Sequence, residues 1–401
     1  MSKNWKKDTA LFLSSQTVSL FGSMLVQHAI TWHITLSTQS GLMMTISIIC
    51  GFLPTFFLSP FAGVWADRYN RKTLIILADS AIAASTLVLA ILFTMGYEKL
   101  WLLFVISAIR ALGAGVQTPA VSAFLPQFVP EDKLTRVNGI NTSIMSSIMF
   151  IAPILAGGLL TMASVRYIFY IDVVTAAMAV AIMLIFLHVP PHARATGNQP
   201  ISYFHDMRNG YEYIKNHDFL KAFFIFGAIF NILVAPAAFL TPLQVTRSFG
   251  PEVWRLTAIE IAFSIGMMAG GIFMASWGGL KNKVHTMILA YLIIGACTIG
   301  IGISPFFWIY LGFMVLTGMS IPLFNTPATV LLQQKVEKDY LGRVFGVMSM
   351  ITSVMMPMGM LVFGPLADIV KIEWILAATG LLVFTQGLIM RGNKVLIKAG
   401  E

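Results

Sequence analysis

The sequence predicts an all-α membrane protein with twelve transmembrane helices in two parallel six-helix repeats. Hydrophobic residues make up 57% of its 401 residues and charged residues 11%, against about 45–50% and 25% in soluble domains. Apolar stretches long enough to cross a hydrocarbon core of about 30 Å recur along the whole chain. Residues of the first half also recur in the second half at a nearly constant offset, which indicates an internal duplication.

The apolar stretches are separated by short links rich in charged residues, proline or glycine, and each has the length of one membrane span. The boundary between the ninth and tenth stretches rests on Ser304 and Pro305. The predicted spans are 9–36, 41–64, 73–95, 100–128, 137–162, 168–189, 219–246, 255–276, 284–303, 306–334, 342–367 and 372–391.

Basic residues divide unequally between the two ends of these spans. Of the 26 lysines and arginines, twenty fall on one side, five on the other, and Arg110 falls inside a span. The positive-inside rule therefore predicts that both chain termini lie in the cytoplasm. Because the bases stand in short loops between apolar spans, we interpret them as topology signals and expect no nucleic-acid partner.

The internal repeat supports the same arrangement. Thr118-Pro119-Ala120 recurs as Thr326-Pro327-Ala328, and Arg136-Val137 recurs as Arg343-Val344. Two halves that begin on the same side of the membrane are parallel repeats. We therefore expect an N-terminal bundle over 1–189, a cytoplasmic linker over 190–217 and a C-terminal bundle over 218–401.

The linker contains a segment with helical periodicity. Ile201, Phe204, Tyr211 and Ile214 would share one helical face, and charged residues the others. The pattern predicts an amphipathic helix lying at the inner leaflet, with a plain flexible linker as the alternative.

A charged turn over 63–72 joins the second and third spans. Its sequence, Gly-x-x-x-Asp-Arg-x-x-Arg-Lys, consists of Gly63, Asp67, Arg68, Arg71 and Lys72. It resembles the loop between helices 2 and 3 of the major facilitator superfamily, a class of secondary transporters. The resemblance implies alternating access, with these residues as a conformational latch between the halves. The alternative is a charge cluster that only sets topology.

Arg110 lies near mid-membrane, where a cation costs about 2.5–3.5 kcal/mol on insertion scales. It therefore requires a water-filled cavity or an acidic partner. The run Arg110-Ala111-Leu112-Gly113 resembles, with altered spacing, a motif that the family associates with proton coupling. A structural arginine bound to carbonyl groups is the alternative.

The predicted span 137–162 carries a second element of this kind. Ala152, Pro153, Ala156 and Gly157 resemble the Gly-Pro-x-x-Gly-Gly motif of drug:proton antiporters, with alanine in place of two glycines. The resemblance implies a tight helix contact that seals the cytoplasmic side. Generic packing of small residues is the alternative.

Four acidic residues fall within or near the spans. Glu260 is the first candidate for a proton carrier, and Asp79, on the third span, is the second and the more structural of the two. Asp172 and Asp368 are expected near the outer surface, with solvated or helix-capping roles. A carboxylate in the membrane interior is a functional candidate because burying its charge is costly.

A substrate cavity is expected around Gln27 and His28 of the first span and Phe230 and Asn231 of the seventh. Hydrogen-bonded cavity packing for His28, and lipid-facing packing for many of the phenylalanines, are the alternatives. We expect a small amphiphilic substrate, and expect no cofactor and no metal.

The branch of the superfamily that the chain resembles most is that of bacterial macrolide-efflux proteins. Phe52-Leu53-Pro54, the turn over 63–72 and Thr118-Pro119-Ala120 carry this resemblance. It implies a monomeric, multi-pass protein of the bacterial cytoplasmic membrane that is not an enzyme and exports amphiphilic drugs such as macrolides in exchange for protons.

Alternatives remain within and beyond transport. The chain would otherwise export an endogenous metabolite or siderophore, act as an uncoupled facilitator, or serve as a transport-inactive receptor or assembly subunit. The sequence contains no phosphate-binding loop of the Gly-x-x-x-x-Gly-Lys-Ser/Thr type, so we expect transport to be driven by an ion gradient. One charge crossing 100 mV supplies about 2.3 kcal/mol.

Overall fold

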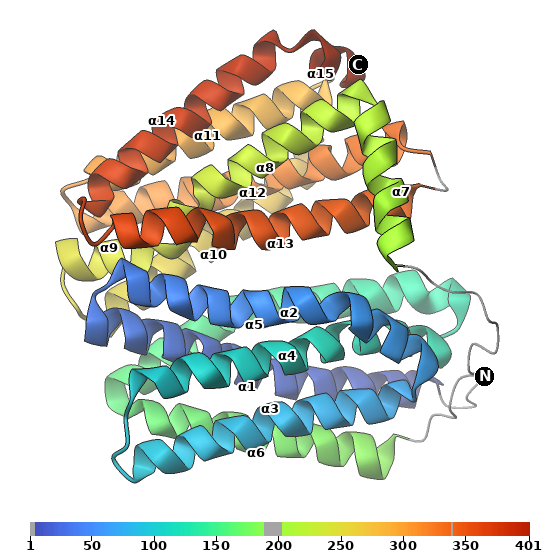
Figure 1. Ribbon diagram of the computed structural model, residues 1–401, viewed down its shortest axis with the longest axis vertical. Coiled ribbons are helices and arrows are strands. Elements are labelled where there is room, and N and C mark those ends of the chain that lie inside the picture. The colour runs from blue at the N-terminus through green and yellow to red at the C-terminus, as the bar shows by residue number, and fades with distance from the viewer. Residues whose placement is uncertain (1–4, 188–202, 338–339) are drawn as a thin grey trace. The chain divides into compact units, whose positions relative to one another are not determined.

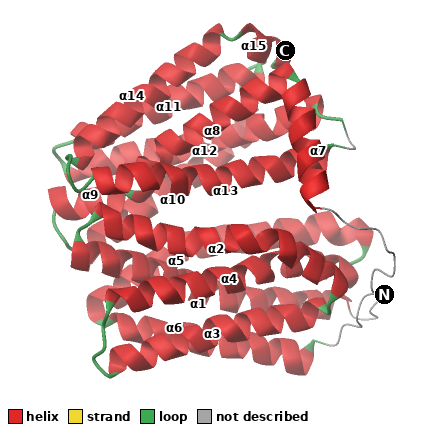
Figure 2. Ribbon diagram, in the orientation of Figure 1, coloured by secondary structure: helices red, strands yellow, loops and turns green. Residues whose placement is uncertain are grey.

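The computed structural model describes residues 5–187, 203–337 and 340–401, and throughout these ranges the regular structure is helical (Figure 2). Twelve segments are long and apolar enough to cross a membrane, which confirms the predicted number of spans. Their main helices are α1 (Trp5–Thr38), α2 (Gly41–Arg68), α3 (Arg71–Thr94), α4 (Leu100–Phe124), α5 (Leu134–Met162), α6 (Val165–Ala181), α8 (Asp218–Phe239), α10 (Val253–Trp277), α11 (Lys283–Ile303), α12 (Phe307–Lys335), α13 (Leu341–Leu366) and α14 (Ile372–Gly392) (Figure 1).

Shorter elements complete the described structure. Those that extend or precede a span are η1 (Leu125–Gln127), η2 (Glu131–Lys133), the π-helical turn η3 (Ile182–Phe186) and α9 (Thr241–Ser248). The other two are α7 (Tyr203–Asn216) and α15 (Lys394–Ala399).

The chain divides by its internal contacts into two units. Unit 1 comprises Met1–Ile34 and Ile46–Ile201, and unit 2 comprises Thr35–Thr45 and Ser202–Glu401. The connection between α1 and α2 therefore groups with unit 2, although both helices run through unit 1. The repeated Thr-Pro-Ala segments lie in corresponding places, Pro119 near the end of α4 and Pro327 near the end of α12.

Unit 1 packs α3 against α4 and α6. At one end its core is aromatic: the ring of Phe12 meets those of Phe124 and Phe128 edge-to-face, with centroids 5.2 and 5.8 Å apart. Edge-to-face pairs of this kind contribute about 0.5–1.5 kcal/mol beyond their buried area. This cluster joins the start of α1 to the end of α4.

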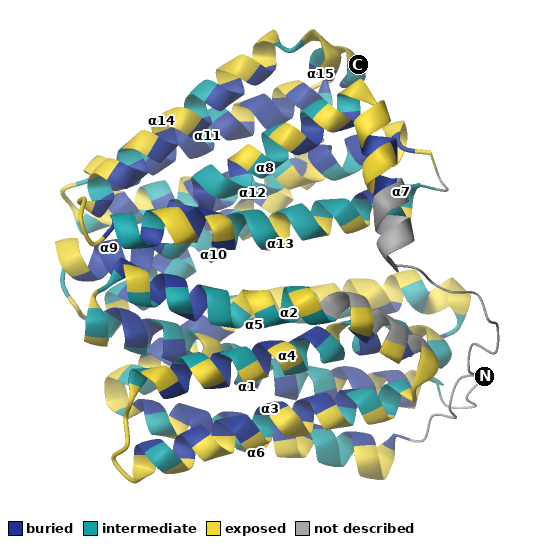
Figure 3. Cartoon of the chain, viewed as in Figure 1, coloured by how far each residue is buried: buried dark blue, intermediate teal, exposed yellow. Residues whose placement is uncertain are grey.

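Unit 2 is built around α11, which packs against α12 and α14 and is largely buried (Figure 3). Small residues allow its neighbours to approach closely. A Cβ atom at Gly266 or Gly270 of α10 would collide with the backbone of α12 at Val315 or Met319. These glycines explain why α10 and α12 lie in backbone contact.

The linker helix α7 belongs to unit 2 and packs against α13 and α8 (Figure 1). Tyr213 and Ile214 are buried, and the Tyr213 ring stacks on Tyr340 with centroids 4.2 Å apart. Of the residues of the predicted apolar face, Ile214 is buried and Tyr211 is 62% exposed, and the placement of this face at the inner leaflet stays a prediction. Stacking on Tyr340 turns Tyr213 inward instead, a choice that helical periodicity alone cannot indicate. Ile201 and the Phe204 side chain lie outside the described residues.

Candidate transport site

Arg110 has an acidic partner buried beside it in unit 1. It stands ten residues past the start of α4 and is 8% exposed. One guanidinium nitrogen lies 2.5 Å from a carboxylate oxygen of Asp172 on α6. The same nitrogen donates to the Thr86 hydroxyl of α3, and the other donates to the Ser23 carbonyl of α1 at 3.3 Å. A low-dielectric interior strengthens such a charge-assisted pair.

The expectation that Asp172 lies in a solvated or capping position is wrong. Its side chain is completely buried, and Arg110 is its ion-pair partner. A Cβ atom at Gly22 of α1 would collide with the Thr175 hydroxyl and reach the Asp172 carboxylate at 3.0 Å. The close approach of α1 therefore shields Asp172 from solvent. The position of Asp172 along its own helix, from which a solvated site was expected, does not indicate that a neighbouring helix covers it.

A second buried carboxylate, Asp79 on α3, lies in the same unit. One of its oxygens accepts hydrogen bonds from the Ser19 hydroxyl and the Gln117 side-chain amide, both at 2.7 Å. Its other oxygen has no hydrogen-bond partner among the described residues. Ser19 and Ser23, one helical turn apart on α1, thus contact the Asp79 carboxylate and the Arg110 guanidinium respectively.

Glu260 lies seven residues past the start of α10, in unit 2, and is half-buried. Within the described ranges no residue forms a hydrogen bond or ion pair with its carboxylate. An unpartnered carboxylate within a span is a functional candidate by default. The structure therefore places the three predicted coupling residues in different units: Arg110 and Asp79 in unit 1 and Glu260 in unit 2.

The charged turn ties together several helix ends of unit 1. Arg71 donates to the Ala66 carbonyl at 2.8 Å and to the Ala123 carbonyl at 2.7 Å, which joins the ends of α2 and α4. Lys72 donates to the Leu187 carbonyl at 2.7 Å, beyond the end of α6. Arg68 is exposed. The surroundings of Gly63 and the side chain of Asp67 lie outside what the structure describes.

The small residues of the predicted α5 motif are buried. Ala152, Pro153, Ala156 and Gly157 are all buried, and α5 packs against α6. Small side chains on one face let neighbouring helices approach within van der Waals contact.

Unit 2 encloses a cavity of about 180 Å³ between α8, α11, α12, α13 and α14. The rings of Phe230, Tyr291 and Phe324 form one wall, with centroids 4.7 to 5.4 Å apart. Four methionines also line it: Met287, Met348, Met356 and Met390. Its polar lining consists of Asn231, Asn325 and Thr352, with no Asp, Glu, Lys or Arg among the described lining residues.

Two of the four residues expected at a substrate cavity, Phe230 and Asn231, line this cavity. The other two, Gln27 and His28, belong to unit 1, where Gln27 is exposed and the His28 ring lies 5.4 Å from the Trp32 ring. No pattern in the sequence indicates Tyr291 and Phe324, because residues from three helices converge there only in the folded bundle.

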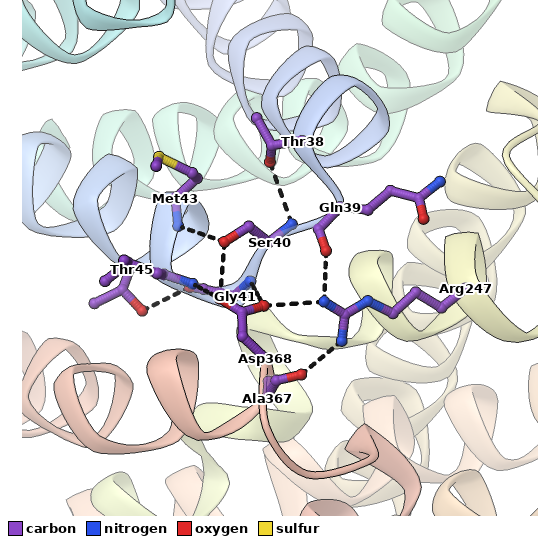
Figure 4. A network of polar contacts seen from close by, with 10 residues as sticks. Thr38, Gln39, Ser40, Gly41, Met43, Thr45, Arg247, Ala367 and Asp368 are labelled. Atoms are coloured by element: carbon purple, nitrogen blue, oxygen red, sulfur yellow. Dashed lines mark hydrogen bonds and ion pairs between the residues drawn. The ribbon is translucent and has the colours of Figure 1, made fainter.

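A network of polar contacts in unit 2 holds the segment between α1 and α2 (Figure 4). The Asp368 carboxylate accepts from the Gly41 amide at 2.7 Å, the Leu42 amide at 3.0 Å and the Ser40 hydroxyl at 2.8 Å. It thereby caps the N-terminus of α2, where amides lack helical partners and the helix dipole favours an anion. This matches the capping role expected for Asp368.

Arg247 completes this network from α9. Its guanidinium lies 3.0 Å from Asp368 and donates to the Ala367 carbonyl at 2.6 Å and to the Gln39 carbonyl. Partial burial raises the pKa of Asp368, but hydrogen bonds from Leu42, Gly41, Ser40 and Arg247 outweigh it and hold the pKa below its usual range. The Asp368 carboxylate is therefore ionised at neutral pH.

Twelve candidate spans and an ion pair buried among them define a multi-pass membrane protein with a charged pair in its interior, a feature that marks functional sites in membrane proteins. The Major Facilitator Superfamily matches residues 9–360, and the chain belongs to this family. It is a membrane transporter and not an enzyme.

Three similar proteins illustrate its relationships. Macrolide efflux protein A of Streptococcus pyogenes is 28% identical over 95% of this chain and 94% of its own length. The Staphyloferrin A transporter of Staphylococcus aureus is 23% identical over 90% of each chain. The crystal structure of the nucleoside transporter NupG has a TM-score of 0.73 at 15% identity, covering 98% of this chain and 99% of its own, and shares the fold.

Proposed function

We propose that the chain exports small amphiphilic compounds, macrolide-like drugs among them, from the bacterial cytoplasm in exchange for protons. In this proposal the protein lies in the cytoplasmic membrane with both termini inside, as the twenty-to-five distribution of bases predicts. The observation that carries the proposal is the aromatic and methionine-rich cavity of unit 2. The similarity to Macrolide efflux protein A supports it.

The lining of the cavity favours apolar ligand groups. Aromatic rings give large contact areas, and methionine side chains adapt to ligands of different shapes. The amide groups of Asn231 and Asn325 supply hydrogen bonds that orient a bound molecule. Because drug-sized ligands occupy about 300–1,000 Å³, a cavity of about 180 Å³ would hold one apolar substituent and leave the rest of the substrate outside it.

We propose proton coupling because unit 1 buries more carboxylates than cations. In the described part of this unit Arg110 is the single buried cation, and Asp8, Asp79 and Asp172 are the buried carboxylates. Asp8 lies in the first turn of α1 and has an interaction of its own, which leaves Asp79 and Asp172 within the spans. Burying an uncompensated charge costs several kcal/mol. Asp172 forms the ion pair, so the group that would bind the transported proton is Asp79, whose second oxygen has no hydrogen-bond partner among the described residues.

Glu260 is the alternative proton carrier in unit 2, and Arg110 would then act only through its ion pair. Arg71 and Lys72 are proposed to stabilise the latch turn from within unit 1, since both donate to carbonyl groups at helix ends there. The substituted motif of α5 is proposed to pack this unit tightly enough to exclude water.

An efflux assay tests the proposal. The chain is expressed in a bacterial strain that lacks its major efflux pumps, and retention of erythromycin and of a lipophilic dye is measured with and without a protonophore. We expect lower retention in expressing cells and loss of the difference when the protonophore is added. Efflux that persists without a proton gradient would identify an uncoupled facilitator, and no difference in retention would favour a receptor.

Export of a siderophore is the second candidate, because one relative is named as a Staphyloferrin A transporter. Polyanionic ligands need cationic partners, and the described lining of the unit 2 cavity contains none. The amphiphilic substrate is therefore favoured.

A further inference from the structure

Unit 1 contains a long surface groove between α1 and α5 that the proposed function does not use. Two adjoining hollows of about 780 and 1010 Å³ share five residues along their walls: Thr17, Val18, Arg136, Ile140 and Ile144. The groove runs along α5 from Arg136 to Leu155, which is roughly 28 Å at about 1.5 Å per residue. This length is close to the full thickness of the hydrocarbon core, about 30 Å. One acyl chain of a lipid reaches about half of that depth and would therefore occupy the part of the groove next to its headgroup.

The hydroxyl groups inside the groove already form hydrogen bonds within their own helices. The Ser143 and Ser147 hydroxyls donate to carbonyls of their own helix at 3.0 and 2.9 Å, and Thr17 does the same at 2.6 Å. Thr175 of α6 also lines the wall, and its hydroxyl donates to the Asp172 carbonyl at 2.9 Å, while Phe21 and Ile148 are among the apolar residues there. A hydrocarbon chain therefore fits this part without leaving a polar group unpaired.

The opposite end of the groove is basic. Lys6, Lys133 and Arg136 line it, and all three are exposed. Lys133 pairs with Asp132 at 2.9 Å, and Lys6 lies over the Trp5 ring. Neither Lys6 nor Arg136 has a carboxylate partner among the residues that the structure describes.

Comparison of the two repeats indicates why Arg136 at this basic end is uncovered. The repeat counterpart of Arg136 is Arg343 in unit 2, whose guanidinium lies 5.4 Å from the Tyr340 ring. There α7 covers the position, since a Cβ atom at Gly210 would come within 3.2 Å of Arg343. The described part of unit 1 has no helix corresponding to α7, so Arg136 keeps a free face.

We propose that this groove binds an anionic phospholipid of the cytoplasmic leaflet. The acyl chain would lie between α1 and α5, and the phosphate group would contact Lys6 and Arg136. Charge complementarity favours this occupant, because a basic site at the level of the headgroups attracts anionic lipids. The cytoplasmic placement follows from the predicted topology.

Native mass spectrometry of the detergent-purified full chain tests the proposal. The probes are palmitoyl-oleoyl phosphatidylglycerol and the phosphatidylcholine with identical acyl chains. We expect preferential retention of phosphatidylglycerol, and we expect K6Q/R136Q to weaken its binding about thirty-fold, given the usual contribution of each base. The matched control K7Q/K221Q removes the same charge from exposed lysines that do not line the groove, and it should retain the lipid like the native chain.

A second pair of variants tests the apolar part. Gly139 lines the groove, and a Cβ atom there meets nothing within 4 Å, so G139L would fill the groove without disturbing the fold. Gly158 is equally open but does not line the groove, which makes G158L the control. We expect only G139L to lose phosphatidylglycerol.

Three results would overturn the proposal. They are equal retention of both lipids by the native chain, equal losses in the control and groove variants, and displacement of phosphatidylglycerol by erythromycin. The last result would assign the groove to the exported compound. Because lipid retention is measured without transport, failure of the efflux assay leaves this test unaffected.

Discussion

The Arg110 guanidinium on α4 and the Asp172 carboxylate on α6 lie 2.5 Å apart in the buried interior of unit 1. Removing one partner of such a pair leaves an uncompensated charge, which costs about 3–5 kcal/mol. We therefore expect D172N to lower the thermal stability of the purified protein sharply. The double variant R110M/D172N should regain much of this loss, because it buries no unpaired charge. Thermal unfolding in detergent measures both effects, and equal instability of the two variants would contradict the interpretation.

Asp79 is expected to govern the pH dependence of transport. An asparagine keeps a hydrogen-bond acceptor for Ser19 and Gln117 but cannot exchange a proton. Substrate binding should therefore survive in D79N, while efflux loses its dependence on an imposed pH gradient in vesicles. The companion variant E260Q tests the alternative carrier. If E260Q rather than D79N abolishes the dependence, the proton carrier is Glu260.

Phe230 is expected to contribute strongly to substrate affinity. Its ring forms part of the cavity wall beside Tyr291 and Phe324. A buried phenylalanine contributes about 1.5–3 kcal/mol, and its loss corresponds to a dissociation constant roughly ten- to hundred-fold larger. F230A should show this loss in erythromycin binding. F306A removes a ring that is 65% exposed and does not line the cavity, so its affinity should equal that of the native chain.

The Asp368 carboxylate is expected to stabilise the protein in a pH-dependent manner. The pKa of Asp368 in the folded state is below the usual value. Its full contribution to the stability of the folded protein is therefore present above about pH 4, the ordinary aspartate pKa. The contribution is lost as the pH falls through the folded-state pKa. At neutral pH, D368N should therefore be less stable than the native chain by about 1 kcal/mol.

Thermal unfolding as a function of pH checks this prediction. The difference between D368N and the native chain should be constant from pH 7 to pH 5 and shrink below about pH 4. A difference that instead grew on acidification would contradict the role assigned to the carboxylate.

The docking of α7 is expected to depend on Tyr213. Its buried ring stacks on Tyr340, and replacing a large buried aromatic residue by alanine costs about 3–5 kcal/mol. We expect limited proteolysis to cleave within α7 much faster in Y213A than in the native chain. Y211A removes an exposed tyrosine from the same helix and should leave the cleavage rate unchanged.

Much of the architecture follows from the sequence alone. The twelve spans were predictable because a bilayer requires about 20 apolar residues per helix whatever the neighbours are. The sequence also predicted that Arg110 needs either a water-filled cavity or an acidic partner, since an isolated cation in the membrane interior is costly. The identity of that partner was not predictable, and Asp172 was assigned a solvated position that it does not occupy.

The partners were decided by the tertiary structure because they depend on which helix faces meet. Gly22 allows α1 to cover Asp172, Tyr340 selects Tyr213 as the inward residue of α7, and Phe230, Tyr291 and Phe324 converge from three helices. Span length and charge distribution are properties of one segment against lipid and water, so the sequence by itself determined them. Ion pairs, cavities and caps arise between segments distant in the chain, and only packing of the helices brings their side chains within a few ångströms.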